Sequence, residues 1–91
     1  TQSIKKNGEQ IALSPREFQL AYIFMHNAGK SFTRDDLLSK VWGAFAEVEP
    51  QTVSVHMSWL RSKLEDDPSN PRYFKTVRGK GYRFDVADGD R

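Results

Sequence analysis

The fold of this chain is decided by the stretch QTVSVHMSWLRSKLEDDPSNPRYFKTVRGKGYRF, residues 51–84. It reads as one long helix followed by a Gly-rich β-hairpin. Pro50 suits the first turn of a helix. Pro68 and Pro71 cannot continue one, so we place the helix at residues 50–66. Four apolar residues at helical spacing predict its buried stripe: Val53, Met57, Leu60 and Leu64.

The hairpin is expected at residues 72–85, with strands at 72–77 and 82–85. An Arg-Gly-Lys-Gly segment at residues 78–81 joins the strands, and its two glycines allow a tight tip. Three basic side chains are expected to reach past this tip: Arg78, Lys80 and Arg83.

Positive charge is concentrated in these two elements. Residues 51–84 hold seven basic and three acidic side chains, whereas residues 1–50 hold six of each. A basic helix beside a basic hairpin is a typical footprint for a polyanion.

Composition limits the class of protein. A chain of 91 residues forms one small domain, and without cysteine it has no disulfide and no cysteine-based zinc site. No apolar run is long enough to span a bilayer, and no signal-peptide pattern opens the chain. We therefore expect a cytoplasmic protein with no membrane partner. Residues 1–91 are interpreted as a single domain, and the start at Thr1 rather than Met suggests that it is excised from a longer protein.

The first half of the chain predicts a hairpin and two helices. Asn7-Gly8 offers the two positive-φ positions of a type I′ turn. Ser14 and Glu17 can form a capping box at the start of the first helix. Apolar residues follow at helical spacing, namely Phe18, Ala21, Tyr22 and Met25, and Gly29 is a suitable stop.

Thr33 is placed to cap the second helix, which Gly43 ends. Its apolar stripe consists of Leu37, Leu38, Val41 and Trp42. A connector at residues 44–49 leads to the third helix. The order hairpin, three helices, hairpin predicts an α+β fold, in which the second and third helices form a helix-turn-helix candidate.

The third helix presents a second face opposite its buried stripe. That face carries Gln51, Val55, Ser58, Trp59 and Ser62, flanked by Ser54 and Arg61 on one side and by Thr52, His56 and Lys63 on the other. Gln and Ser can hydrogen-bond base edges, Val can contact thymine methyl groups, and Arg or Lys can neutralise phosphates. Val55 and Trp59 form an apolar pair that needs a partner: DNA, another subunit or the chain's own N-terminal region.

Six segments match successive motifs of one known effector domain. They are LSPREF at 13–18, SFTRDDLL at 31–38, VWG at 41–43, TVSVHM at 52–57, LRSKL at 60–64 and TVRGKGYRF at 76–84. Together they resemble the winged-helix DNA-binding domain of OmpR/PhoB-type response regulators. The match runs from about residue 10 to residue 84, and its Thr-Val-Arg-Gly-x-Gly-Tyr motif is specific.

The resemblance implies a winged helix-turn-helix transcription regulator of a two-component phosphorelay. The helix at 50–66 would enter the major groove of double-stranded DNA, and the wing at 72–85 would reach the minor groove. Matching positions imply phosphate contacts from Trp42, His56, Arg61 and Tyr82, and wing contacts from Thr76 and Arg78. The 44–49 loop corresponds to one that touches RNA polymerase. A receiver domain phosphorylated on Asp, and a homodimer on tandem sites, would belong to the longer protein.

Three residues depart from the usual pattern of the family. Gln51 and Trp59 stand where Arg is common, and Ser54 stands where Asp is common. Each good bidentate Arg contact is worth roughly 1–3 kcal/mol of base discrimination, so these departures weaken any transfer of the family's target sequences to this chain. The chain also holds only the last two strands of the family's N-terminal sheet.

Other functions are less favoured. His26 and His56 stand on different helices, and no motif places a nucleophile or a metal ligand beside either. We therefore expect no enzyme, no catalytic residue, no metal and no cofactor. The acidic run at residues 65–67 ends a helix and lacks the spacing of a calcium loop. The alternative is a winged-helix protein-interaction module that docks a partner through Val55 and Trp59.

Overall fold

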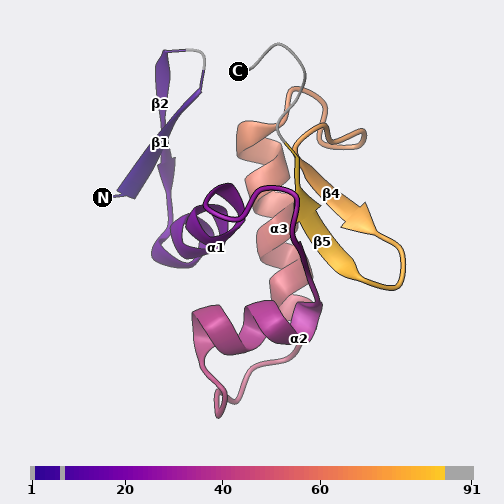
Figure 1. The fold of residues 1–91 in the computed structure, drawn as a ribbon. Helices are drawn as coiled ribbons and strands as arrows, with labels where there is room; N and C mark the ends of the chain where they lie inside the picture. The colour runs from indigo at the N-terminus through magenta and orange to yellow at the C-terminus, as the bar shows by residue number, and fades with distance from the viewer. Residues whose placement is uncertain (1, 7, 86–91) are drawn as a thin grey trace.

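Helix α3, Gln51–Leu64, is the central element of the computed structural model, which describes residues 2–6 and 8–85. It lies between the other two helices and the C-terminal strands (Figure 1). Its buried residues are the four predicted ones: Val53, Met57, Leu60 and Leu64. The helix stops at Leu64, two residues before the predicted end, and Pro50 stands just outside its first turn.

Helix α1, Pro15–Met25, begins with the predicted capping box. The Ser14 amide donates to Glu17 Oε1 at 2.8 Å, and the Glu17 amide donates to Ser14 Oγ at 3.3 Å. The helix ends at Met25 and not at Gly29. Its core-facing residues are Glu17, Leu20, Ala21 and Phe24, whereas Tyr22 and Met25 are exposed. Two apolar stripes share this helix, so periodicity alone could not decide which one is buried.

The predicted second helix divides into two parts. Helix α2, Arg34–Leu37, starts at Thr33, whose hydroxyl accepts a hydrogen bond from the Asp36 amide at 3.0 Å. It continues as the π-helical turn η1, Leu38–Trp42. The Gly43 amide, at φ +105°, closes this turn by donating to the carbonyl of Leu38 at 3.1 Å.

A three-stranded antiparallel sheet covers the other side of α3, in the order β3-β5-β4. Strands β4, Phe74–Val77, and β5, Gly81–Phe84, form the predicted hairpin with shorter strands than expected. Strand β3, Ser31–Phe32, is an addition that the sequence did not predict. It pairs Phe32 with Tyr82 of β5 and so ties the segment before α2 to the hairpin.

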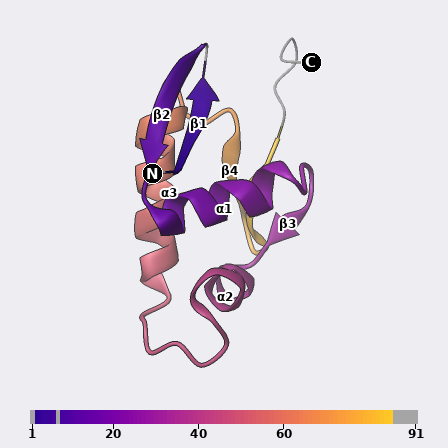
Figure 2. The same ribbon diagram turned by 90° about the vertical axis from the view of Figure 1, so that its left-hand side faces the viewer.

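The N-terminal hairpin consists of β1, Gln2–Lys6, and β2, Glu9–Leu13. Gly8 has φ +81°, as a tight turn requires, while the other predicted turn residue, Asn7, lies outside the described residues. The hairpin stands above the start of α1 (Figure 2), on the other side of α3 from β4 and β5 (Figure 1). Lys6 joins it to the end of α3 through an ion pair with Asp66 at 2.8 Å.

These elements form the predicted α+β winged helix-turn-helix arrangement. Within the described part of the chain, no helix is long and apolar enough to cross a bilayer.

Gly81 is expected to be essential for the sheet. It has φ +95°, and a Cβ there would overlap the Phe32 carbonyl oxygen and lie 2.7 Å from Thr33 Cα. Gly81→Ala should therefore separate β3 from β5 and destabilise the fold by roughly 3 kcal/mol or more. Thermal unfolding followed by circular dichroism measures the loss.

Gly79→Ala is the matched control. Gly79 also has positive φ, +75°, but a Cβ there meets nothing within 4 Å. This variant should lose only about 1–2 kcal/mol of stability, because alanine is strained at positive φ. Equal melting temperatures for the two variants would show that the contact with β3 does not matter.

Candidate nucleic-acid interface

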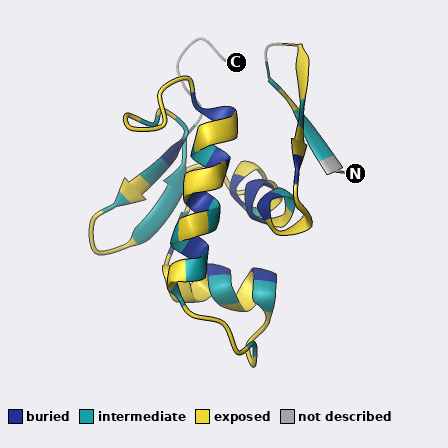
Figure 3. Ribbon diagram, turned by 180° about the vertical axis from the view of Figure 1, so that it is seen from behind, coloured by how far each residue is buried: buried dark blue, intermediate teal, exposed yellow. Residues whose placement is uncertain are grey.

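The outward face of α3 is open to solvent. Its five predicted members are all exposed, with Val55 at 43% and Trp59 at 48% of their full accessible surface. Seen from behind, exposed and buried residues alternate along α3, with β4 and β5 beside it (Figure 3). The flanking residues Thr52, Ser54, His56 and Arg61 are half-buried, and Lys63 is exposed.

Three aromatic rings from η1 and α3 form a continuous column. The His56 ring lies 4.9 Å from the Trp42 ring and 4.7 Å from the Trp59 ring, measured between centroids. His56 Nδ1 lies 2.8 Å from the Thr52 carbonyl oxygen, which can only accept, so Nδ1 carries the hydrogen. The column therefore holds both tryptophans in place on one side of the outward face.

Trp59 is neither buried in the core nor fully free. Besides the His56 ring, it lines a shallow depression of about 380 Å³ with Ser14, Glu17, Ser62 and Lys63. Ser14 and Glu17, at the start of α1, thus line the same depression as the indole, and about half of the Trp59 surface remains available to a partner.

Arg61 joins α3 to the hairpin. Its Nε donates to the Phe74 carbonyl and its Nη2 donates to Thr76 Oγ1, both at 2.8 Å. Its guanidinium also lies 5.7 Å from the centre of the Tyr82 ring, and the Tyr82 hydroxyl lies 3.0 Å from Ser54 Oγ. Four residues predicted as separate DNA contacts thus form one helix–wing network: Ser54, Arg61, Thr76 and Tyr82. These two bonds use two of the five guanidinium N–H donors, so Arg61 can still donate to a phosphate.

Glu65 fixes the start of β4 on the end of α3, a role that the sequence analysis missed. Its side chain is only 4% exposed. Its carboxylate accepts hydrogen bonds from the backbone amides of Arg72, Tyr73 and Phe74, at 2.8, 3.0 and 2.7 Å. A carboxylate at a helix C-terminus is disfavoured by the helix dipole. The position of Glu65 there was therefore a hint in the sequence that its side chain has a structural role.

Glu17 and Lys63 join α1 to α3 through an ion pair of 2.7 Å. Burial of Glu17, which is 2% exposed, acts to raise its pKa. Hydrogen bonds from Lys63 and Ser14 outweigh this effect and hold the pKa of Glu17 below its usual value. The positive charge of Lys63 is thus already balanced inside the protein.

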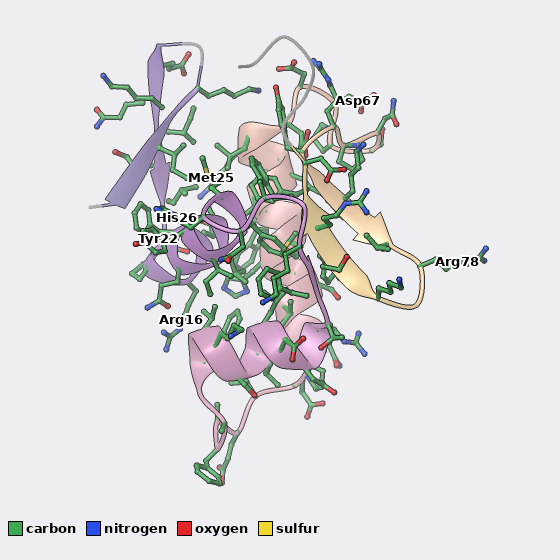
Figure 4. All side chains as sticks on the ribbon, in the orientation of Figure 1. Arg16, Tyr22, Met25, His26, Asp67 and Arg78 are labelled. Carbon is green, nitrogen blue, oxygen red and sulfur yellow. The ribbon has the colours of Figure 1, made fainter. Side chains whose placement is uncertain are left out.

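The tip of the β4–β5 hairpin presents two of the three expected cations. Arg78 and Lys80 are exposed, and Arg78 projects away from the body of the molecule (Figure 4). The prediction that Arg83 reaches past the tip is wrong. Its guanidinium binds the Asp85 carboxylate at 2.7 and 3.0 Å, at the opposite end of β5, and this bond lowers the pKa of Asp85.

No cluster of three or more His, Asp or Glu side chains that could hold a metal ion occurs among residues 2–6 and 8–85. The exposed groups on α3 and the tip are instead hydrogen-bonding, apolar and cationic ones, which suit base edges and phosphates.

Comparison with known protein families gives one match, described as "Transcriptional regulatory protein, C terminal", over residues 8–84. A probable transcriptional regulatory protein of Picosynechococcus is 51% identical over 77 residues, which are 85% of this chain and 31% of that protein. The alkaline phosphatase synthesis transcriptional regulatory protein SphR of Synechococcus elongatus is 47% identical, over 82% of this chain and 29% of its own length. The chain therefore spans about a third of the length of these relatives.

Many solved structures share the fold, and two of them serve as examples. The response regulator DrrB of Thermotoga maritima, an OmpR/PhoB homologue, superimposes with a TM-score of 0.80 and 39% identity, over 87% of this chain and 36% of its own. The RstA DNA-binding domain of Klebsiella pneumoniae, in complex with the RstA box, gives a TM-score of 0.80 and 36% identity. That match covers 91% of this chain and 82% of the RstA chain.

Replacement of Glu65 by Ala should loosen the hairpin from α3. Three backbone amides would lose their buried acceptor, which we expect to cost about 3 kcal/mol of unfolding free energy. Chemical denaturation measures this cost.

Asp66→Ala is the neighbouring control. Asp66 is well exposed, and its pair with Lys6 lies on the surface, so the midpoint of unfolding should hardly change. A similar midpoint for the two variants would contradict the anchoring role of Glu65.

Proposed function

This chain belongs to the C-terminal, DNA-binding domains of OmpR/PhoB-type transcriptional regulators, and from this premise we propose how it holds double-stranded DNA. Helix α3 enters the major groove, and the tip of β4 and β5 reaches the adjacent minor groove. The observation that carries this proposal is the helix–wing network, in which Arg61 bonds to both Phe74 and Thr76. It holds the reading helix and the wing as one rigid unit that can grip a duplex at two points.

The proposed contacts fall into two groups. Those facing bases are Gln51, Ser54, Val55, Ser58, Trp59 and Ser62. Those at phosphates or in the minor groove are Trp42, Thr52, His56, Arg61, Lys63, Thr76, Arg78, Lys80 and Tyr82. Among the lysines and arginines of this second group, Lys63 contributes least charge, because Glu17 neutralises it at 2.7 Å. The two cations of the tip are unpaired by any carboxylate in the described chain, and the negative potential of a narrow minor groove suits them.

The whole protein is proposed to be longer than this chain. Since relatives such as DrrB are response regulators and the chain covers 36% of that structure, we place an N-terminal receiver domain, phosphorylated on Asp, before residue 1. The full-length protein would act in the cytoplasm as a homodimer on tandem sites, and transfer of phosphate to the receiver would control it.

The connector at residues 44–49 is proposed to touch RNA polymerase. Phe45 is 97% exposed there, and two acidic residues, Glu47 and Glu49, follow it in the same loop. Val48, 36% exposed in the same loop, adds a second apolar side chain to the surface that we propose the polymerase covers.

Arg78→Ala should weaken DNA binding without unfolding the domain, because the exposed Arg78 makes no contact that the fold needs. On a duplex selected from random DNA, we expect about a tenfold loss of affinity, with the slope of log affinity against log salt reduced by about one. Fluorescence anisotropy at several salt concentrations measures both quantities.

Lys5→Ala removes the same charge from the N-terminal hairpin, which stands on the opposite side of the molecule from the β4–β5 tip (Figure 1), and should leave affinity nearly unchanged. Equal losses for the two variants would mean that net charge, not the wing, governs binding. If no duplex binds, or if binding barely responds to salt, the result would favour the alternative function, a protein-interaction module that docks a partner through Val55 and Trp59.

Phe45→Ala, made in the full-length regulator, should reduce transcription from a promoter carrying the selected site while duplex affinity stays constant. Transcription in vitro with purified polymerase, alongside anisotropy on the same duplex, separates the two effects. Unchanged transcription would contradict a polymerase contact through this loop.

A further inference from the structure

Val55 and Trp59 interrupt an otherwise polar reading face. They stand one helical turn apart on α3, at 43% and 48% exposure, among the polar side chains of Gln51, Ser58 and Ser62. We call this pair the apolar strip. Residues four apart on a helix are neighbours, so the strip presents one continuous apolar surface to whatever approaches α3.

The strip is held rigid by the protein itself. The Trp59 ring packs on His56 at 4.7 Å, and His56 packs on Trp42 at 4.9 Å. His56 is fixed in turn by the hydrogen bond from Nδ1 to the Thr52 carbonyl. Val55 is β-branched, which restricts its side chain to one main rotamer in a helix. Because little freedom is left to lose, contact with a partner costs little ordering entropy.

The major groove offers a matching apolar group. Among the base edges exposed there, the C5-methyl group of thymine is apolar, whereas the other edge groups donate or accept hydrogen bonds. The strip itself carries no charge, so it gains nothing from phosphates. Positive charge is supplied elsewhere, by Arg78 and Lys80 at the wing tip.

We propose that the apolar strip selects DNA sites by contact with thymine C5-methyl groups in the major groove. The inference rests on the proposed function and adds to it a chemical rule for the bound sequence. The wing would supply most of the salt-dependent affinity, and Val55 and Trp59 would supply discrimination between thymine and the other bases that salt hardly alters.

The test replaces thymine by deoxyuridine, which lacks only the methyl group. Duplexes are first selected from random DNA with this chain, and the thymines of the selected site are then substituted one at a time. For each methyl group in contact with the strip, removal should reduce affinity roughly fourfold, as expected for burial of one methylene-sized group. Anisotropy at high and low salt should give the same ratio.

Val55→Ser and Trp59→Gln connect this effect to the strip. Ser and Val have similar helix propensity and both positions are exposed, so the variants should fold, which circular dichroism verifies. In each variant, the affinity for the thymine duplex divided by that for the deoxyuridine duplex should fall toward one at one or more substituted positions of the DNA site. Val48→Ser is the matched control, because Val48 is an exposed valine in the 44–49 loop, and its ratio should remain that of the unaltered chain.

Each result decides the matter. Equal affinity for thymine and deoxyuridine sites overturns the inference while the proposed DNA binding stands. A difference that persists unchanged in both Val55→Ser and Trp59→Gln assigns the effect to DNA shape and also overturns it. Failure to bind any duplex removes the proposed function and the inference together.

Discussion

The buried carboxylate of Glu65 is the constraint on which the shape of this domain depends. It gathers three consecutive backbone amides, from Arg72 to Phe74, at the point where α3 ends and β4 begins. A buried backbone amide without an acceptor costs more folding free energy than most surface contacts contribute. These hydrogen bonds therefore hold the start of β4 at the end of α3. The two hydrogen bonds of Arg61 then hold β4 alongside the helix.

Several charged side chains form ion pairs within the domain, so their charge is not free to attract a ligand. Glu17 holds Lys63 between α1 and α3, and Asp85 holds Arg83 at the base of the hairpin. The seven basic residues between 51 and 84 therefore overstate the charge that a polyanion would meet. Of the basic residues outside these ion pairs, the exposed Arg78 and Lys80 stand close together at the wing tip, and this pairing favours a contact in one groove over a diffuse attraction.

Sequence reasoning succeeded where a single local pattern decides the structure. The apolar stripe of α3 was predicted in full, because its spacing leaves only one face for the core. It failed on α1, where two apolar stripes compete, and on β3, a two-residue strand that exists only because β5 lies beside it. The five residues predicted for the outward face of α3 are all exposed, but the bonds that join the flanking residues to the hairpin were not foreseen. Arg61, Thr76 and Tyr82 meet across about twenty residues of chain, and no local rule links them.

Neighbouring residues alone were enough to specify the order of the two hairpins and three helices, the caps of α1 and α2, the core face of α3 and the tight glycine tip of the hairpin. These depend on backbone preference and on periodicity, which are properties of neighbouring residues. Tertiary structure alone decided which charges are neutralised, which side of α1 is buried and how firmly the wing is joined to α3. These depend on distances between residues far apart in the chain, and such distances exist only once the core has brought the elements together.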